Sequence, residues 1–167
     1  MALYRSDTRE VSFTSLPQPL ALELRAHAAK NQLVLEPSAV RCWLTHSVNP
    51  PAESFFGRMF GRRANPVDPE AEHDTVVVLH ATHLLVAAWG EKRGAMALSL
   101  PLAQASIGRM SKLAAQLGGG GTEPGMDISG FPGEHGRPGS YFVKLGEDAA
   151  GAECYRAVEA AIVAIKN

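Results

Sequence analysis

TVVVLHATHLLVAAW, residues 75–89, is the stretch that decides the fold of this chain. Its first six residues are mostly β-branched and apolar on both faces, which is typical of a strand at the centre of a sheet. Residues 83–89 form a second apolar run, and Ala81 and Thr82 between the two runs leave room only for a tight turn. Ala-Thr is not a preferred two-residue turn, but the two runs together predict a β-hairpin.

Further strands are expected on both sides of this hairpin. Residues 39–45 alternate between two faces, with Cys42 on one face and Trp43 on the other. After the hairpin, short strands are predicted at residues 95–100, 102–107, 126–131 and 140–145. The glycine run at 118–121 predicts a flexible loop, and a Gly/Pro-rich turn at 132–139 separates the last two strands.

The clearest single element is an amphipathic helix at residues 147–166. Its apolar stripe has helical spacing and consists of Cys154, Tyr155, Val158, Ile162 and Ile165. Glu147 and Asp148 lie near the positive end of the helix dipole, where carboxylates are favourable. Because such a stripe has to be buried and the sheet is the only large candidate, the sequence predicts an α+β fold in which this helix covers an antiparallel sheet.

The N-terminal segment is expected to lie outside this unit. Ser15, with Gln18 three residues later and Pro17 between them, predicts the start of a helix that continues to about residue 31. Residues 1–14 alternate only loosely and are expected to be a disordered or packed arm, and the helix is expected to pack on the domain from outside. The predicted organisation is an N-terminal arm and helix at 1–32 and a domain at 33–167 with a long insertion at 50–73.

Length and composition fit one ordinary globular domain. With 167 residues, 46% of them hydrophobic and 20% charged, the chain can bury a core without a metal or disulfide. Its net charge of −1 supplies no field that attracts nucleic acid, so no nucleic-acid partner is expected. Cys42 and Cys154 form no C-x-x-C pair, which favours two buried free thiols. Without a signal-peptide core or an apolar run of about 18 residues, a cytoplasmic protein is predicted.

Seven strand candidates followed by one terminal helix are the order of a pleckstrin-homology-like (PH-like) domain. Residues 76–86 resemble the "apolar strand, tight turn, Leu-Leu-Val strand" hairpin of bacterial PH-like and GRAM-type domains, and the last strand and helix are similar to theirs. The resemblance covers residues 33–49 and 74–167. It implies an open antiparallel β-barrel of about seven strands plugged by the C-terminal helix, with an N-terminal helical extension. It also implies a non-catalytic module, without a cofactor, that binds lipid headgroups, peptides or neighbouring subunits.

The segment that points most directly to a function lies within residues 50–73, which carry four prolines and no strand pattern. Insertions of this length are usually functional or disordered. The predicted binding residues are Phe55, Phe56, Arg58, Met59, Phe60, Arg62 and Arg63. In a helix their apolar side chains gather on one side with arginines beside them, which favours a protein partner or self-association. An anionic membrane surface is an alternative, and so is a passive insertion whose phenylalanines tuck over the barrel.

A catalytic interpretation rests on His80 and His83, with Asp74 nearby, as the centre of a metal-dependent or other hydrolase. Residues three apart on a strand point to opposite faces, and the spacing identifies no fourth ligand, so no metal site is predicted. Cys42 and His46 share one strand face without a visible third group that would orient them. The sequence also lacks a G-x-S-x-G elbow. No catalytic residue and no enzyme activity are therefore expected.

Overall fold

The computed structural model describes residues 4–59, 61–108, 124–132, 135 and 137–167. These residues contain eight strands in two antiparallel sheets. The first sheet, in the order β1-β2-β3-β4-β5, consists of β1 (Arg5–Val11), β2 (Arg41–Val48), β3 (Glu72–Leu79), β4 (His83–Gly90) and β5 (Gly94–Pro101). The second consists of β6 (Ser106–Gly108), β7 (Gly125–Pro132) and β8 (Pro138–Lys144). The helices are α1 (Gln18–Lys30), α2 (Phe55–Met59) and α4 (Ala149–Lys166), and 3-10 turns lie at Phe13–Ser15 and Pro37–Ala39.

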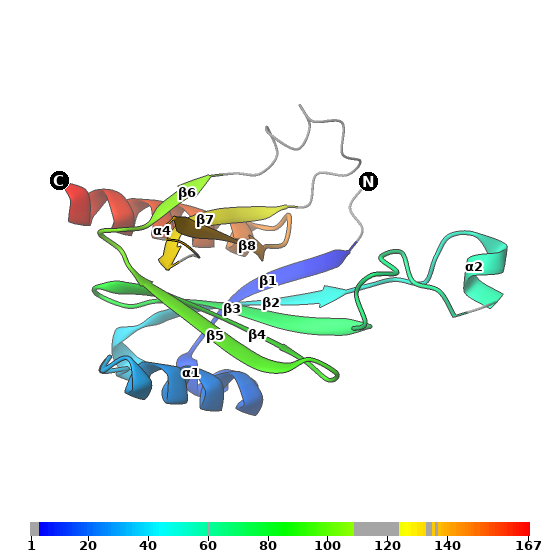
Figure 1. Cartoon of the computed structure of the whole chain (residues 1–167), viewed down its shortest axis with the longest axis horizontal. Coiled ribbons are helices and arrows are strands. Elements are labelled where there is room, and N and C mark those ends of the chain that lie inside the picture. The colour runs from blue at the N-terminus through cyan, green and yellow to red at the C-terminus, as the bar shows by residue number, and fades with distance from the viewer. Residues whose placement is uncertain (1–3, 60, 109–123, 133–134, 136) are drawn as a thin grey trace.

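The elements stack in layers on the five-stranded sheet (Figure 1). α1 covers one face of this sheet, and the three-stranded sheet and α4 lie over the other. The α1-side core includes Phe13, Leu20, Leu24, Cys42, Leu44, Val76, Val78 and Leu85. The α4-side core includes Trp43, Val77, Leu84, Val86, Leu100, Met126, Ile128, Val143, Cys154, Val158 and Ile162. The central strands are therefore buried on both faces.

The β3–β4 hairpin is confirmed. Val77 faces the α4-side core, whereas Val76 and Val78 face the α1-side core, and each of the three is at most 1% exposed. A hydrogen bond of 3.0 Å from the His80 backbone N–H to the His83 carbonyl closes the turn. The run is apolar on both faces because it separates two cores.

The C-terminal helix is also confirmed, with one correction. Asp148 is its N-cap residue and accepts a hydrogen bond of 2.7 Å from the Gly151 N–H. Val158 and Ile162, at 0% and 6% exposure, are buried in the α4-side core. Ile165 was expected on the same buried stripe but is 40% exposed, because the last turn of α4 extends past the sheets (Figure 1).

The N-terminal segment differs in part from the expectation. Residues 5–11 form β1, an edge strand that pairs with β2 along its whole length, so this part of the arm is packed and not disordered. Ser15 does not cap α1, because it belongs to the preceding 3-10 turn and the helix begins at Gln18. Leu20 and Leu24 are both 0% exposed, so α1 closes a core of the protein.

Strands β2–β5, strands β6–β8 and α4 follow one another in the predicted order, but the two sheets do not close into a barrel. The strand expected at 102–107 is reduced to Ser106–Gly108, and β1 adds a strand that the sequence did not predict. The glycine run at 118–121 lies outside the described residues. The α+β class is confirmed, and the architecture is two packed antiparallel sheets with a C-terminal helix.

Candidate functional site

The insertion forms a loop that projects from one end of the five-stranded sheet (Figure 1). Two backbone hydrogen bonds hold the two sides of residues 50–64, the insertion loop, together. The Ala52 N–H donates to Arg62 O at 2.9 Å, and the Ala64 N–H donates to Pro50 O at 2.8 Å. Short α2 lies at the tip of this ladder, so the loop carries a small helix away from the body of the protein.

Asn49, at the end of β2, anchors the base of the insertion loop. Its side chain is 0% exposed. The side-chain amide donates to Asn65 O at 2.9 Å, and its carbonyl oxygen accepts from the Asn65 N–H at 3.0 Å. Arg63 adds a hydrogen bond of 2.9 Å to the backbone oxygen of Asn49. The buried amide of Asn49 fixes the direction in which the loop leaves the sheet.

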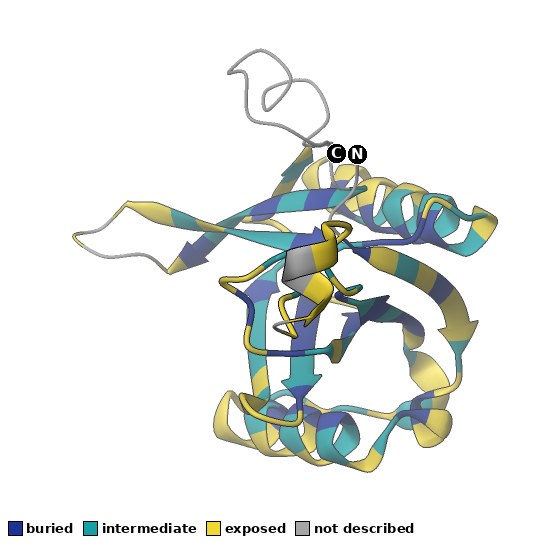
Figure 2. Ribbon diagram, turned by 90° about the vertical axis from the view of Figure 1, so that its right-hand side faces the viewer, coloured by how far each residue is buried: buried dark blue, intermediate teal, exposed yellow. Residues whose placement is uncertain are grey.

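The tip of the insertion loop is apolar and exposed. Phe55 is 73% exposed and Met59 is 61% exposed. Arg58 and Arg62 are exposed beside them, and Arg58 donates to the backbone oxygen of Glu53 at 3.2 Å. Figure 2 looks onto this tip and shows the described part of α2 in the colour of exposed residues. The alternative in which the phenylalanines tuck over the barrel therefore fails for Phe55.

Two of the predicted binding residues lie beyond what the structure describes. Phe60 is outside the described residues, and the side chain of Phe56 is not among those described. At the base of the loop, the described residues form a cavity of about 300 Å³. It is lined by Arg5, Pro50, Pro51, Ala52, Glu53 and Arg58. Two arginines, one glutamate and three apolar residues thus line a cavity beside the exposed tip.

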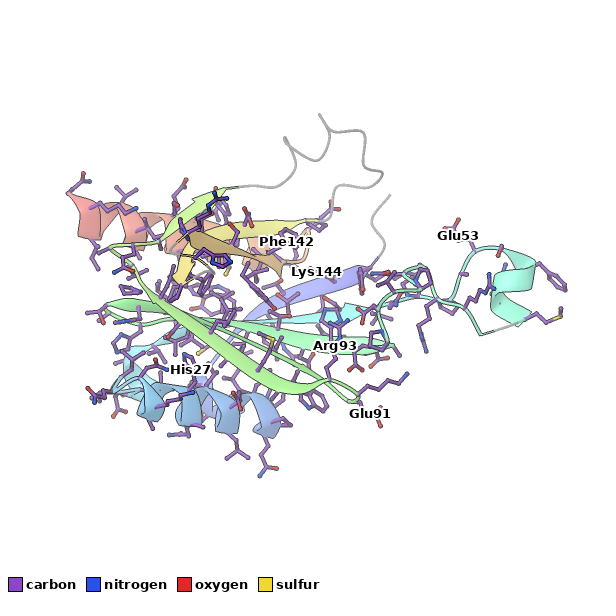
Figure 3. All side chains as sticks on the ribbon, viewed as in Figure 1. His27, Glu53, Glu91, Arg93, Phe142 and Lys144 are labelled. Atoms are coloured by element: carbon purple, nitrogen blue, oxygen red, sulfur yellow. The ribbon has the colours of Figure 1, made fainter. Side chains whose placement is uncertain are left out.

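A second cavity, of about 260 Å³, lies where β8 approaches the five-stranded sheet. This inter-sheet pocket is lined by Tyr4, Asn65, Val67, Asp68, His73, Thr75, Ala88, Arg93, Tyr141, Phe142 and Lys144. Figure 3 labels three of these side chains: Arg93 from the turn after β4, and Phe142 and Lys144 from β8. No sequence pattern brought these residues together, because they come from the N-terminus, two connections and three strands.

Asp68 organises the polar side of the inter-sheet pocket. It accepts hydrogen bonds from the Tyr4 hydroxyl, from Arg93 Nη2 at 2.6 Å and from the Glu70 N–H at 3.0 Å. Burial alone would raise the pKa of Asp68, but these hydrogen bonds and the charge of Arg93 outweigh burial and lower the pKa. Burial and the hydrogen bond to Asp68 raise the pKa of Tyr4 to about 12, so its hydroxyl remains a donor.

His73 contributes an unsatisfied polar atom to the same pocket. Its Nδ1 is buried and has no hydrogen-bond partner among the described residues. The nearest carboxylate oxygen, on Asp68, is 4.0 Å away, and the Tyr4 ring meets the imidazole edge-on at 5.5 Å between centroids. Burial, followed by the positive charge of Lys144, lowers the pKa of His73. The imidazole is therefore neutral at pH 7.

His80 and His83, the histidines of the hydrolase alternative, do not lie in one site with Asp74. The rings of His80 and His83 lie 6.1 Å apart at the hairpin turn, where both bond to Thr82. Asp74 lies six residues earlier on β3, about 20 Å away along the strand, and instead binds His46 Nδ1 at 2.8 Å. Asp74 is therefore too far from the two histidines to act with them in the proposed hydrolase site.

The cysteine alternative fails for a similar reason. Cys42 and His46 lie on the same face of β2, but four residues of strand place them about 13 Å apart. Cys42 and Cys154 are both free and 0% exposed. Burial raises the pKa of each thiol to about 12, so neither carries a thiolate at neutral pH.

Comparisons with known proteins give no relative of this chain. No protein family matches its sequence, and neither a curated protein nor a solved structure matches it. Within the described ranges, no helix combines the length and apolar character needed to cross a bilayer. The same residues bring no three His, Cys, Asp or Glu side chains into an arrangement that could hold a metal ion.

Proposed function

We propose that this chain is a PH-like binding module that captures a protein partner, or a second copy of itself, through the tip of its insertion loop. The order of four strands (β2–β5), three strands (β6–β8) and a terminal helix supports the PH-like assignment. In this proposal β1 and α1 are additions to the minimal fold, and the open gap between the sheets is a variation on its barrel. The module binds and does not catalyse.

The observation that carries the proposal is the exposure of Phe55 and Met59 on a loop whose base is fixed. Large apolar side chains grouped on an exposed segment are typical of interaction sites. Because Asn49 and the loop's own hydrogen bonds already fix its direction, binding orders little additional backbone. An aromatic side chain that enters a partner's pocket is the kind of group that dominates interface energetics.

The charge of the insertion loop favours an acidic protein surface. Three arginines and one glutamate give the loop a net charge of +2, whereas the whole chain carries −1. The remainder of the chain is therefore negative and can attract the loop of a second copy. Glu53 within the loop opposes binding to anionic lipid, whereas Arg5 and Arg58, which line the cavity at the base of the loop, can pair with acidic side chains of a protein partner. These features favour protein over membrane.

A site-specific crosslinking experiment tests the proposal. A photoreactive phenylalanine analogue replaces Phe55 in the full chain, and in a matched control the analogue replaces Leu22, which is 59% exposed on α1. We expect a discrete crosslinked protein, either a partner or a second copy, from position 55 only. The double variant Phe55→Ser, Met59→Ser should also abolish self-association or partner binding in sedimentation velocity, with unfolding unchanged.

Two results would overturn the proposal. The first is equal crosslinking from positions 55 and 22, or the absence of any crosslink from either. The second is loop-dependent binding to phosphatidylserine vesicles that weakens with salt, without a protein crosslink. That second outcome would assign the loop to a membrane surface.

A further inference from the structure

We propose that the inter-sheet pocket binds a small monocarboxylate whose carboxylate is attached to a flat apolar body. This site is separate from the exposed tip of the insertion loop, and its occupancy does not depend on the function proposed for that tip. The argument rests on the balance of hydrogen-bond donors and acceptors in the lining, on its net charge and on its apolar walls.

The donors of the pocket exceed its acceptors. Asp68, the carboxylate in the lining, already accepts from Tyr4, from Arg93 and from a backbone N–H. A guanidinium has five N–H donors, and in the described part of the chain one N–H of the Arg93 guanidinium donates to Asp68 at 2.6 Å. His73 Nδ1 is buried without a partner among the described residues, and it is a further donor when the imidazole carries its proton on Nδ1. A ligand that fits such a lining has to supply acceptors.

The charge of the lining specifies a monoanion. Arg93 and Lys144 are positive and Asp68 is negative, so the lining has a net charge of +1 when His73 is neutral. Lys144 Nζ lies over the Tyr4 ring, which holds its charge at the wall of the pocket. A single carboxylate balances this charge, whereas a phosphate dianion would exceed it and lie beside the negative Asp68. Carboxylate is also the group that the fork of an arginine side chain binds in two-point geometry.

The remaining walls fit a flat apolar body. Val67, Ala88, Tyr141 and Phe142 supply apolar surface around the polar groups. The volume of about 260 Å³ is near the lower end of the range for ligand pockets and corresponds to about nine water molecules at ~30 Å³ each. One ring with a carboxylate fits this space. A larger ligand would have to displace β8 or the 65–68 segment.

Binding of an anion is coupled to protonation of His73. The charged and titratable groups that face this imidazole are Tyr4, Asp68 and Asp74, and the cations Arg93 and Lys144. A bound carboxylate adds a negative charge to this set and stabilises the imidazolium. By linkage, affinity is higher at pH 5.5 than at pH 8, and a benzoate-type carboxylate itself stays ionised at both pH values.

Titration of the full chain with sodium benzoate, followed by NMR, tests the proposal, with benzamide as the neutral isostere and inorganic phosphate as a second anion. We expect saturable shifts in residues 65–75 and 141–144, an affinity for benzamide at least tenfold lower, and tighter benzoate binding at pH 5.5 than at pH 8. Lys144→Gln should weaken benzoate binding at least tenfold without changing unfolding, and the exposed Lys30→Gln should not weaken it.

Equal affinity for benzoate and benzamide would overturn the proposal, as would unchanged benzoate binding in Lys144→Gln. Phosphate that displaces benzoate or binds more tightly would refute the choice of a planar monocarboxylate. Absence of any saturable shift would show that the pocket is only a gap between the two sheets. None of these results depends on the insertion loop, so they leave the proposed function of Phe55 and Met59 untouched.

Discussion

Replacing Glu70 by alanine is expected to destabilise the fold by about 3–4 kcal/mol. Glu70 is 2% exposed, and its Oε1 accepts hydrogen bonds from the Lys92 N–H at 2.9 Å and the Arg93 N–H at 2.7 Å. Hydrogen bonds to a charged group contribute about 1.5–3 kcal/mol each, which gives about 3–6 kcal/mol for the pair. The loss should fall in the lower part of this range because Lys92 and Arg93 are exposed and water can reach their N–H groups. Glu70→Gln keeps a neutral acceptor and should lose about half as much.

Urea unfolding followed by tryptophan fluorescence measures this loss, since Trp43 is 0% exposed and becomes solvated on unfolding. Glu91→Ala is the matched control, because Glu91 lies in the same turn but is exposed (Figure 3). It should change the unfolding free energy by less than about 0.5 kcal/mol. A loss below 1 kcal/mol for Glu70→Ala, or equal losses for the alanine and glutamine variants, would refute the idea that the buried carboxylate holds the turn.

Ile162→Ala should lower the free energy of unfolding by about 2–5 kcal/mol, because Ile162 is only 6% exposed in the α4-side core. Val163 is 51% exposed, so Val163→Ala should lower it much less. Similar losses for the two variants would contradict the placement of α4. Cys42 and Cys154 should react slowly with a thiol reagent in the native state, because burial raises the pKa of both thiols to about 12. Rapid labelling without unfolding would place them outside the cores. The folded-state pKa of His73 lies below its ordinary value of 6.5, so the unfolded chain binds a proton more readily and stability falls as the pH drops below about 6.5. His73→Gln should make unfolding less sensitive to pH between 7 and 5, and an unchanged slope would refute this origin.

The elements that could be predicted from the sequence are those in which buried residues recur with the period of a strand or helix, or fill both faces of a strand. The central hairpin was recognisable because Val76, Val77 and Val78 are all buried, two on one face of the sheet and one on the other. α4 was recognisable because Val158 and Ile162 recur at helical spacing. In both elements the periodicity of the buried residues is a local property of the sequence.

β1 was missed because its burial does not depend on apolar residues. It is an edge strand, and its Thr8 is only 7% exposed. The Thr8 hydroxyl forms a hydrogen bond of 2.7 Å with the hydroxyl of Thr45. The Thr8 N–H is bound by Asp148 at 2.7 Å, so the N-cap of α4 also occupies a donor of β1. The hydrophobic pattern of residues 5–11 contains none of this information, because the partners lie 37 and 140 residues away.

The inter-sheet pocket was missed for the same reason. Tyr4 and Asp68 are 64 residues apart in sequence and meet only because β1 and the segment before β3 reach the same end of the sheet. Asp68 and Glu70 flank Pro69 in a region without strand or helix pattern, where acidic residues usually indicate a solvated loop. The insertion loop differs, because its apolar and basic residues are contiguous in sequence and could be singled out without a fold.

Both candidate sites lie at one end of the five-stranded sheet, and the residues along the strands explain why. On the α4-side face, the side chains of both strands become more polar towards that end. Those of β2 are Trp43, Thr45 and Ser47 in this order, and those of β3 are Val77, Thr75 and His73. The α4-side face of the sheet therefore becomes polar towards the end that carries the inter-sheet pocket, where Thr75 and His73 line the cavity. Leaving the sheets apart keeps His73 and Arg93 beside a cavity, and the same end carries the connection from β2 to β3 that forms the insertion loop. A gradient of polarity along β2 and β3 thus accounts for the position of the inter-sheet pocket between two sheets that do not close into a barrel.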